Sequence, residues 1–368
     1  MRLDLRVVEL RLTEPLRISR STMTSRDAVE LTVRHGGASG HGEVVASTYL
    51  GLPTGEILRH GRALDLLRYP DPETALSELQ CLAAPFGELP PGVLAGLEAA
   101  LLDLVGKRAG APVHRLLGLP GPPAAATART IAIVDPARAA AQAARLAADG
   151  FRVLKVKAGS ADPADDLARV RAVRAGAPEA ELLLDPNGAW TVARSLALIP
   201  RFAALGVTAV EQPTAPGHPE WLAEVAERSE LPVIADEDAV SLADAVRLAG
   251  RVQGINVKLA KCGGVAAALR ICAALQGSGT EVMLGCLTAS SLGIAPAVHL
   301  VDRARWVDLD GHLLLRHDPW RGIGGTDGVV RTTDRAGLGV VPVRTLPSSP
   351  GHPQPPGGGV SGSRSTVR

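Results

Sequence analysis

Aromatic residues are scarce in this chain, at 2% of 368 residues, so its core must be built from smaller side chains. Hydrophobic residues still make up 46% of the sequence, and Ala, Leu and Val must supply most of the packing. Cysteine is also rare: Cys81, Cys262, Cys272 and Cys286 are scattered, with no metal-ligand pairing. This spacing excludes a disulfide framework, and we expect four buried free thiols.

Long apolar runs and an excess of charge are absent too. Nothing approaches the ~18 unbroken apolar residues that a membrane span needs. The first residues, Met1 to Val7, alternate polar and apolar side chains like a strand and lack the apolar block of a signal peptide. Lys and Arg number 39 against 38 Asp and Glu, which leaves no basic field for nucleic acid. We therefore expect a soluble cytoplasmic protein without a membrane or nucleic-acid partner.

The first third of the chain, residues 1–122, is a mixed α and β region. Strands are predicted at about 2–11 and at 28–33, and helical periodicity dominates residues 54–108. Two prolines at 122 and 123 mark a boundary. This region is therefore expected to form a unit of its own.

Beyond the boundary, residues 123–315 alternate short β-rich runs with Ala/Leu/Arg-rich segments of helical periodicity. Eight such runs, about 25 residues apart, predict a parallel βα barrel rather than an antiparallel sandwich. The chain then returns to turns and short strands over 316–347, and the Pro/Gly/Ser-rich residues 348–368 are predicted to be a disordered tail. The strand candidates are 128–134, 153–158, 181–185, 207–211, 232–236, 254–259, 281–285 and 306–309.

Three acidic residues end three consecutive predicted strands, where the chemistry of such barrels sits. Asp185, Glu211 and Asp236 stand at equivalent heights on these strands. Neighbouring strands are less than ~5 Å apart, so the carboxylates would repel one another strongly without a cation. Hard oxygen ligands without histidine favour Mg²⁺ over zinc, and we predict one Mg²⁺ per subunit. Taken singly, each residue can instead cap the helix that follows.

Lysines flank this predicted metal site. Lys155 and Lys157 are two residues apart on a strand and share one face, while Lys258 ends a later strand on the other side of the metal. Such a pair, Lys157 and Lys258, can remove a proton from one face of a carbon and return one to the other, while the metal stabilises an enediolate. Burial and the like charge of Lys155 are expected to lower the pKa of the base. Lys155 is thus assigned electrostatic support, and Lys261 is expected to be a solvated or helix-start residue.

The order of these motifs resembles the enolase superfamily, in its muconate-lactonizing-enzyme subgroup. The set is Lys-x-Lys, Asp-x-Asn, Glu-Gln-Pro, Ala-Asp-Glu and Asn-x-Lys-x-x-Lys-x-Gly-Gly, and the resemblance runs from about residue 2 to 345. It implies a modified (β/α)7β TIM-like barrel with an N-terminal α+β capping domain that the C-terminal segment completes. It also implies that Asp185, Glu211 and Asp236 bind the metal and that Lys157 and Lys258 are the acid/base pair. Lysine bases working beside Mg²⁺ are a described pattern of this superfamily.

The last predicted strand adds a resemblance to one group of enzymes within this subgroup. Asp308-Leu309-Asp310 resembles the Asp-x-Asp signature of dipeptide epimerases, in which an acidic pair holds the free ammonium group of a dipeptide. The strand that leads to Cys286 also resembles that of L-Ala-D/L-Glu epimerases. The resemblance implies an isomerase that inverts the α-carbon of the C-terminal residue of a dipeptide by 1,1-proton transfer. Asp308 and Asp310 can otherwise cap the turn at Gly311.

Two loops of the N-terminal region are expected to reach the site. The first contains Arg17, Arg20 and Arg26, and Arg20 can pair with a glutamate side-chain carboxylate of the substrate. A solvated position is nevertheless the commoner outcome for any of the three arginines. Glu43 and Tyr49 in the second loop are candidates for supporting positions.

Three alternatives stay open at this stage. N-acylamino acid racemases, o-succinylbenzoate synthases and muconate-type cycloisomerases share the machinery, but their substrates have no ammonium group for Asp308 and Asp310 to bind. A Schiff-base aldolase also uses a barrel lysine, yet it needs no carboxylates around a metal. A catalytically silent binding protein is disfavoured because desolvated charge without function is costly. The preferred hypothesis is a homo-oligomeric enzyme acting on a small-molecule dipeptide or related carboxylate.

Overall fold

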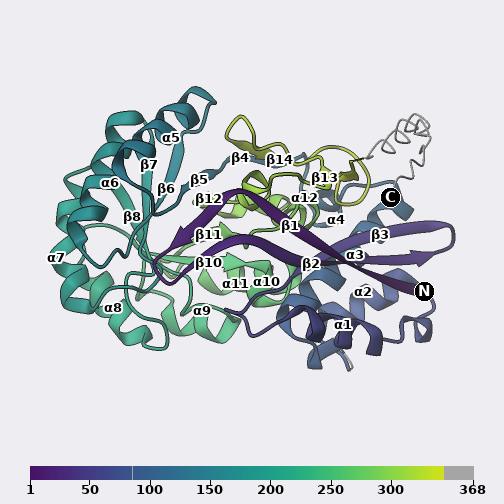
Figure 1. Ribbon diagram of the computed structural model, residues 1–368. Coiled ribbons are helices and arrows are strands. Elements are labelled where there is room, and N and C mark those ends of the chain that lie inside the picture. The colour runs from purple at the N-terminus through teal and green to yellow at the C-terminus, as the bar shows by residue number, and fades with distance from the viewer. Residues whose placement is uncertain (85, 344–368) are drawn as a thin grey trace, which may run out of the picture.

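The computed structural model describes residues 1–84 and 86–343, and the predicted tail at 348–368 lies outside the described residues. An antiparallel sheet opens the fold, in the order β1 (Arg2–Ile18), β2 (Ser21–His35) and β3 (Ala38–Val45). Figure 1 shows the two long strands, β1 and β2, running from the N-terminal cap across to the barrel.

The predicted loop over residues 17–26 is instead the end of this hairpin, so the loop prediction was wrong. Ile18 pairs with Ser21 on either side of a two-residue turn, beyond a register shift between Arg11 and Leu16. An irregularity of this kind bends a strand without ending its pairing. The bent hairpin thus carries its tip over the barrel.

The cap helices are α1 (Thr54–Ala63), α2 (Pro72–Gln80), α3 (Pro91–Ala109) and α4 (Val113–Leu116), with 3-10 turns at Leu66–Arg68 and Phe86–Glu88. Helix α3 packs closely on β3. A Cβ on Gly42 would lie 2.0 Å from the carbonyl oxygen of Gly96, and one on Gly40 would lie 2.1 Å from that of Ala100. Glycine is therefore required at both positions. Cys81, expected to be buried, is exposed because it lies where α2 ends.

The second sheet holds eight parallel strands in strict sequence order from β5 to β12, and these two end strands contact each other to give a nearly closed barrel. Seven strands are each followed by a helix, which confirms the predicted modified (β/α)7β fold. The strands are β5 (Ala128–Ile131), β6 (Val153–Lys157), β7 (Glu181–Asp185), β8 (Val207–Glu211), β9 (Val233–Ala235), β10 (Gly254–Lys258), β11 (Glu281–Gly285) and β12 (Trp306–Asp308). The helices are α5 (Pro136–Ala148), α6 (Pro163–Gly176), α7 (Val192–Ala203), α8 (Pro219–Arg228), α9 (Leu242–Leu248), α10 (Leu259–Cys262), α11 (Val265–Leu275) and α12 (Ser291–Val298).

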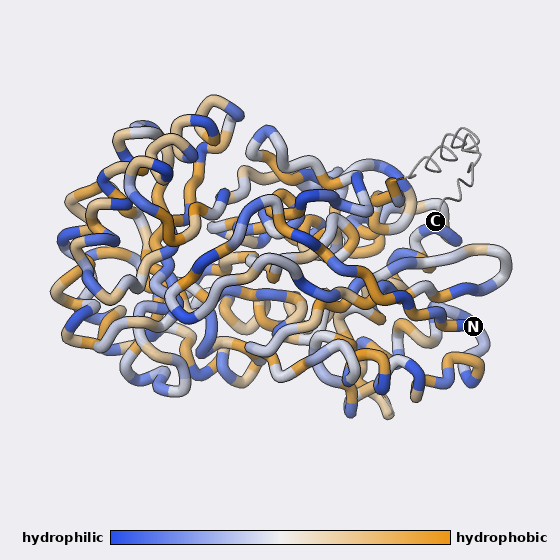
Figure 2. Tube along the Cα trace, viewed as in Figure 1, coloured by the Kyte–Doolittle hydropathy of each residue, from blue (hydrophilic) through white to orange (hydrophobic). Residues whose placement is uncertain are grey.

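The barrel interior is filled mainly by aliphatic side chains, with one tryptophan among them. Its cluster contains Ala128, Leu183, Ala209, Ile234, Met283 and Trp306. The outer faces of the strands pack against the helices in a larger core that continues into the cap. Figure 2 shows hydrophobic and hydrophilic residues alternating along the outer helices, because only one face of each helix meets the barrel.

The C-terminal segment returns to the cap, which confirms that part of the fold prediction. It contains 3-10 turns at Val301–Arg303 and Gly311–Leu314 and strands β13 (Trp320–Arg321), β14 (Val329–Arg331) and β15 (Val341–Pro342), and β14 pairs with β4 (Ala124–Ala126). The Trp320 indole donates to Glu30 on β2 at 2.9 Å, and the Leu338 amide donates to Asp103 on α3 at 2.9 Å. Buried polar contacts of this kind fix the segment in one position.

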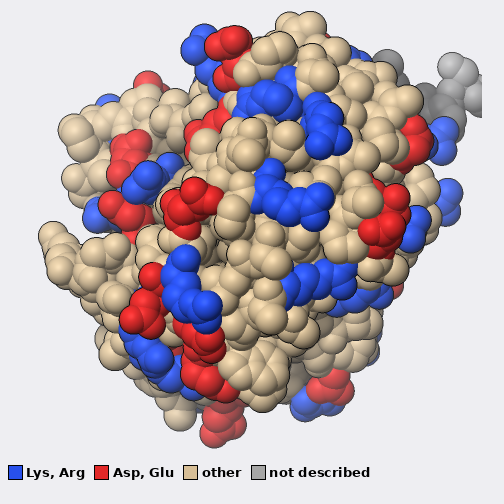
Figure 3. All heavy atoms as spheres, turned by 90° about the vertical axis from the view of Figure 1, so that its left-hand side faces the viewer, with Lys and Arg blue, Asp and Glu red and all other residues tan. Residues whose placement is uncertain are grey.

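The surface carries charges of both signs. On the face where α6, α7 and α8 lie, Lys and Arg side chains are interspersed with Asp and Glu (Figure 3). This mixture reflects the nearly equal numbers of 39 cationic and 38 anionic residues. No helix within residues 1–84 or 86–343 is long and apolar enough to cross a membrane.

Candidate active site

A cavity opens where the β1–β2 hairpin lies over the carboxyl ends of the barrel strands. Its volume is about 830 Å³ including the open mouth, which lies within the range of small-molecule sites. The hairpin contributes Leu16, Met23 and Arg26 to the lining, and the barrel contributes Lys157 and Lys258 among others. The two parts of the fold therefore build one site together.

The three predicted metal ligands come together at the barrel ends. Asp185 and Glu211 end β7 and β8, Asp236 directly follows β9, and all three are buried. Lys155 of β6 lies among these carboxylates, with its Nζ 3.2 Å from Asp185 Oδ2 and 2.6 Å from Glu211 Oε2. The same Nζ donates to Asp308 Oδ2 at 2.8 Å. Lys155 thus sits where electrostatic support was predicted.

The two predicted acid/base lysines enter the cavity from different sides. Lys157 donates to Asp185, and Lys258 Nζ donates to Asp236 Oδ2 at 2.6 Å. Their strands, β6 and β10, are four positions apart in the order of eight, so they face each other across the barrel. The two lysine side chains therefore reach the cavity from opposite sides of the barrel.

Lys261 is buried, and the expectation of a solvated residue was wrong. It lies on the one-turn helix α10, which begins immediately after β10, and its side chain is buried. Its Nζ donates to the Asp236 carboxylate at 2.6 Å and to the Asp236 carbonyl oxygen at 2.7 Å. Lys261 therefore fixes both the side chain and the backbone of a predicted metal ligand.

Negative neighbours outweigh burial at Lys155 and Lys258, whereas burial lowers the pKa of Lys261. Desolvation alone would lower the pKa of Lys258, but the carboxylates of Asp236 and Glu211 raise it. The pKa of Lys155 is raised in the same way, with Asp308 as the largest contributor. The lowering of the base pKa that was predicted from burial and the like charge of Lys155, beside a bound metal, stays a prediction. A divalent cation on the same carboxylates would offset their charge and bring a lysine pKa down.

The carboxylates respond unequally to the same surroundings. Burial would raise the pKa of Asp185, but Lys157 and Lys155 lower it to about 2. Burial raises the pKa of Glu211 to about 7, and Lys155 offsets this only in part. The difference follows from the number of lysines at each side chain, two at Asp185 against one at Glu211.

The donor chemistry of the three carboxylates fits Mg²⁺, which prefers hard oxygen ligands. Within the described residues, no three His, Cys, Asp or Glu side chains are already drawn close enough to hold a metal ion. The lysines lie between the carboxylates instead, as the nearest cations to groups that repel one another. Glu211 Oε2 accepts no hydrogen bond of good geometry from the described chain, although Lys155 is 2.6 Å away. Asp185, Glu211 and Asp236 are the residues that would hold Mg²⁺.

Three Asn and Gln residues hold the carboxylates or the backbone that carries them, and sequence reasoning assigned no role to these residues. Asn187 N donates to Asp185 at 2.8 Å, and Asn256 Nδ2 donates to Glu211 at 2.8 Å. Gln212 Oε1 accepts from the backbone amide of Asp236 at 3.0 Å. The available signal was their place inside the motifs, within two residues of a site carboxylate or lysine.

The predicted ammonium-binding pair is held by cations of the protein. Asp308 Oδ2 accepts from Lys155, whereas Oδ1 is buried and has no hydrogen-bond partner in the part of the chain described. Asp310 Oδ2 accepts from Arg129 at 3.0 Å and from the Thr130 amide at 2.8 Å. The structure therefore brings Asp308 to the lysines but turns one oxygen of Asp310 toward β5.

Arg20 is committed to the protein and closes the hairpin tip onto the barrel. Its Nη1 lies 2.8 Å from Glu237 and donates to the Asn187 carbonyl at 3.0 Å, and the guanidinium lies over the Tyr49 ring. Cys286 lines the cavity, and burial raises the pKa of its thiol. A neutral thiol is an apolar lining group and not a nucleophile.

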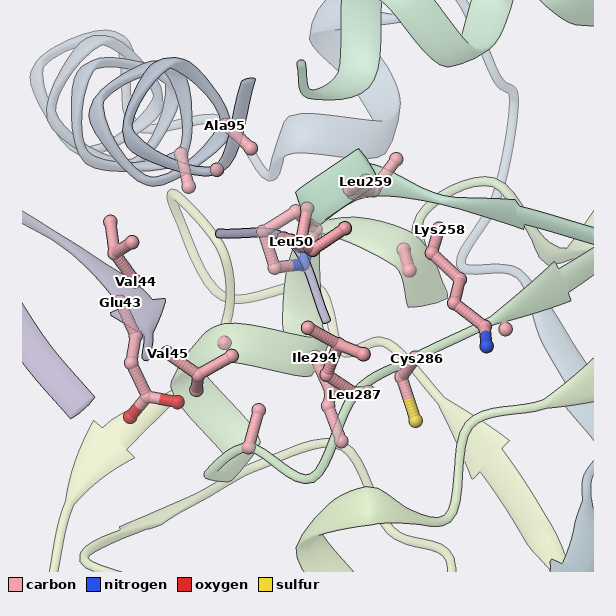
Figure 4. A pocket seen from close by; sticks show the side chains of 18 of the residues that line it. Glu43, Val44, Val45, Leu50, Ala95, Lys258, Leu259, Cys286, Leu287 and Ile294 are labelled. Atoms are coloured by element: carbon pink, nitrogen blue, oxygen red, sulfur yellow. The ribbon is translucent and has the colours of Figure 1, made fainter. Parts of the chain in front are cut away.

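A second, largely apolar cavity lies between the cap and the barrel next to the site. Figure 4 shows Glu43 at one side of it and Lys258 and Cys286 at the other. Glu43 is buried and accepts hydrogen bonds from the amide and hydroxyl of Ser290, at the start of α12. Glu43 thus holds the loop after β11, which lines the active-site cavity.

Comparison with known proteins gives the same picture. The model of the mandelate racemase / muconate lactonizing enzyme N-terminal domain matches residues 2–118, and that of the enolase C-terminal domain-like family matches residues 138–345. The L-Ala-D/L-Glu epimerase of Bacteroides thetaiotaomicron is 29% identical over 91% of this chain and 86% of its own length. The hydrophobic dipeptide epimerase of Roseobacter litoralis is 31% identical over 93% of this chain and 99% of its own.

A solved structure extends the likeness to three dimensions. The crystal structure of the dipeptide epimerase from Enterococcus faecalis V583, complexed with Mg and the dipeptide L-Leu-L-Tyr, matches with a TM-score of 0.85 at 28% identity. The match covers 92% of this chain and 98% of that chain. Family models, relatives and fold agree with the motifs carried by β6 to β10. The chain therefore belongs to the mandelate racemase/muconate lactonizing enzyme family of the enolase superfamily, and the predicted resemblance is confirmed.

Proposed function

We propose that this chain is a Mg²⁺-dependent dipeptide epimerase that inverts the α-carbon of the C-terminal residue of a dipeptide. The observation that carries the proposal is the pair Lys157 and Lys258, which reach one cavity from opposite strands of the barrel. The activities named for the relatives support the same reaction. One Mg²⁺ per subunit is held by Asp185, Glu211 and Asp236.

Each lysine serves one face of the α-carbon. One removes the α-proton as a general base, and the other donates a proton to the opposite face, so that the configuration inverts. Mg²⁺ supplies positive charge that stabilises the negative charge developing on the substrate carboxylate. Lys155 holds the neighbouring carboxylates in place, and Arg20 keeps the hairpin tip closed over the site. Closure excludes water from the reacting carbon.

Isotope exchange tests the two-lysine arrangement. Dipeptides incubated in deuterated buffer with Mg²⁺ should gain one deuterium at the α-carbon, as read by mass spectrometry. K157M and K258M should each lose epimerisation by roughly 10²- to 10⁴-fold. Each variant should still exchange the α-proton of one epimer, and the two variants should retain opposite epimers. K107M is the matched control, because this cap lysine does not line the cavity.

Two results would count against the proposal. Absence of exchange for every dipeptide in the wild-type protein would remove the reaction itself. Equal exchange of both epimers by both lysine variants would remove the assignment of the lysines. Borohydride trapping of a carbonyl substrate, insensitive to a chelator, would point to an aldolase instead.

Asp308 is the proposed partner of the dipeptide ammonium group. Its Oδ1 is buried and accepts no hydrogen bond from the described residues, so it has an acceptor to offer a cation. D308N should lower kcat/KM for dipeptides by about 10- to 100-fold more than for N-acetyl amino acids. Equal losses for both substrate classes would favour an N-acylamino acid racemase or cycloisomerase, whose substrates have no ammonium group.

A further inference from the structure

Arg26 is a cation of the active-site cavity that has no anionic partner among the described residues. It lies on β2, opposite Leu10 of β1, and its side chain lines the cavity together with Lys157 and Lys258. Its Nε and Nη2 each lie 3.4 Å from the Met23 sulfur, and a thioether is a weak acceptor. Nη1 is buried and has no hydrogen-bond partner in the described chain.

The other arginines near the site each have an anionic partner in the protein. Arg20 is paired with Glu237, and the buried Arg169 contacts Asp166 together with the carbonyl oxygens of Val134 and Lys157. No Asp or Glu of the described residues forms an ion pair with Arg26 or lies close enough to stabilise its charge. Burial accordingly lowers the pKa of Arg26, the opposite of what a neighbouring carboxylate would do.

A partly buried guanidinium without a counter-ion is costly, and its fork of donors matches a carboxylate with two parallel hydrogen bonds. We infer that Arg26 binds a second carboxylate of the substrate, in addition to the α-carboxylate held at the metal. The inference rests on the proposed function and adds a specificity-determining residue to it. The role first predicted for Arg20 therefore passes to Arg26.

The position of Arg26 restricts where this second carboxylate sits. The α-carboxylate belongs at the barrel side, beside Asp236, while Arg26 belongs to the hairpin that covers the same cavity. Cys286, which directly follows β11, lines the same cavity with a neutral thiol. Leu16 and Met23 give the cavity an apolar surface next to the guanidinium. The substrate thus presents a short apolar stem that ends in a carboxylate.

Two sources offer this chemistry. The first is the side chain of an acidic C-terminal residue in a dipeptide, and the second is a carboxylate-bearing acyl group on the substrate nitrogen. Matched pairs separate them: L-Ala-L-Glu against L-Ala-L-Gln for the side chain, and N-succinyl against N-acetyl amino acids for the acyl group. Members of each pair differ mainly in the charge that Arg26 is expected to bind.

The experiment measures kcat/KM for all four substrates with wild type, R26Q, R26K and the control R17Q. Arg17 lies on the same hairpin, but it is exposed to solvent and does not line the cavity. Wild type should prefer the charged member of one pair, and R26Q should reduce kcat/KM for that member about 10- to 100-fold, mainly through KM. R26K should recover part of this loss, whereas the neutral member and R17Q should stay near wild-type values.

The outcomes separate the inference from the proposed function. If wild type exchanges α-protons of neutral and charged members alike, or if R26Q slows both equally, the role of Arg26 is overturned while the epimerase activity stands. If wild type exchanges none of them or any other dipeptide, the proposed function fails, whatever Arg26 does. Should R26Q fail to fold, as judged by circular dichroism, the wild-type preference and R26K decide the question.

Discussion

At the scale of single residues, the site depends on which cation each carboxylate contacts. Lys155 contacts Asp185, Glu211 and Asp308, and Lys261 contacts Asp236, all in the interior. A buried network of this kind is balanced only while each member is present, because one unpaired ion costs more than the loss of a whole pair.

Removing Lys155 should therefore destabilise the fold. K155M is expected to lower the free energy of unfolding by about 3–5 kcal/mol, since it leaves buried carboxylates that repel one another. Urea denaturation followed by circular dichroism measures the change. Added Mg²⁺ should stabilise K155M more than wild type, because the ion takes over charge that Lys155 neutralises. The exposed pair Arg228–Glu224 offers the control, with R228Q expected within about 0.5 kcal/mol of wild type. A K155M protein as stable as R228Q would contradict this account.

Glu43 gives a prediction about pH. Burial raises its pKa from 4.5 to about 7, and Glu30 and Asp318 add to the shift, while hydrogen bonds from Ser290 oppose it. A carboxyl group with a raised pKa contributes stability that is present below pH 4.5 and is lost as the pH rises through 7. The Gln side chain of E43Q carries no charge at any pH. The free energy of unfolding of E43Q should therefore rise relative to that of wild type between pH 5 and pH 8, by at most about 3 kcal/mol. Urea unfolding of both proteins at the two pH values provides the test, and an unchanged difference would refute it.

At the scale of elements, the contact between β3 and α3 sets the distance from the cap sheet to its helix. G42A should destabilise the protein by about 3 kcal/mol or more, because the new Cβ would meet the Gly96 carbonyl oxygen and neither backbone can yield alone. Gly55, in the first turn of α1, has nothing within 4 Å of an added Cβ. G55A is therefore expected to be neutral or to stabilise by about 0.5 kcal/mol. Thermal denaturation of the two variants and wild type measures both effects. A G42A protein as stable as wild type, or a clearly destabilised G55A protein, would contradict the prediction.

The elements that carry the chemistry were predictable because their signal is local. Asp185, Glu211 and Asp236 recur with the period of a βα unit, and the parallel register brings strand ends of equal phase to one edge. Lys157 and Lys258 also lie at the ends of predicted strands, so the number of strands between them predicts that they face each other across the barrel. The fold class followed from that repeat together with the family resemblance.

The approach of residues 17–26 to the site was predicted, but the partners of their arginines were not predictable, because those partners come from distant segments. Arg20 meets a carbonyl and a carboxylate from the loops after β7 and β9, and Arg26 is covered by packing that its own neighbours do not reveal. Lys261 was misjudged for a similar reason. It follows a strand lysine by three residues, and only the single turn of α10 places it under Asp236 rather than in solvent.

At the scale of the whole molecule, the cap and the barrel are joined by a shared apolar core and by buried polar contacts. Glu98 on α3 accepts from the amides of Val265 and Ala266 at the start of α11, and Glu43 accepts from Ser290. The homo-oligomer and the domain boundary at residue 122 stay predictions. Because these contacts connect the cap to the barrel, ligand binding at the barrel end should stabilise both parts of the fold.

Magnesium should accordingly raise the thermal stability of the whole chain. At 100 times its dissociation constant, an ion that binds only the folded state contributes about 2.7 kcal/mol, enough to raise Tm by a few degrees. A chelator should remove the rise, and D236N should show none. Differential scanning calorimetry with and without Mg²⁺ measures the effect independently of catalysis. A Tm that ignores the ion would argue against the metal assignment.

The bent hairpin of β1 and β2 separates recognition from chemistry within one chain. Acid and base groups are fixed in the barrel wall, while the guanidinium expected to choose between substrates is mounted on a ribbon of the other domain. Substitutions in the hairpin can therefore change the substrate preference without changing the catalytic residues. Exchange of residues 16–26 between relatives that prefer different substrates should transfer the substrate specificity. The proton-transfer step at the α-carbon should stay unchanged.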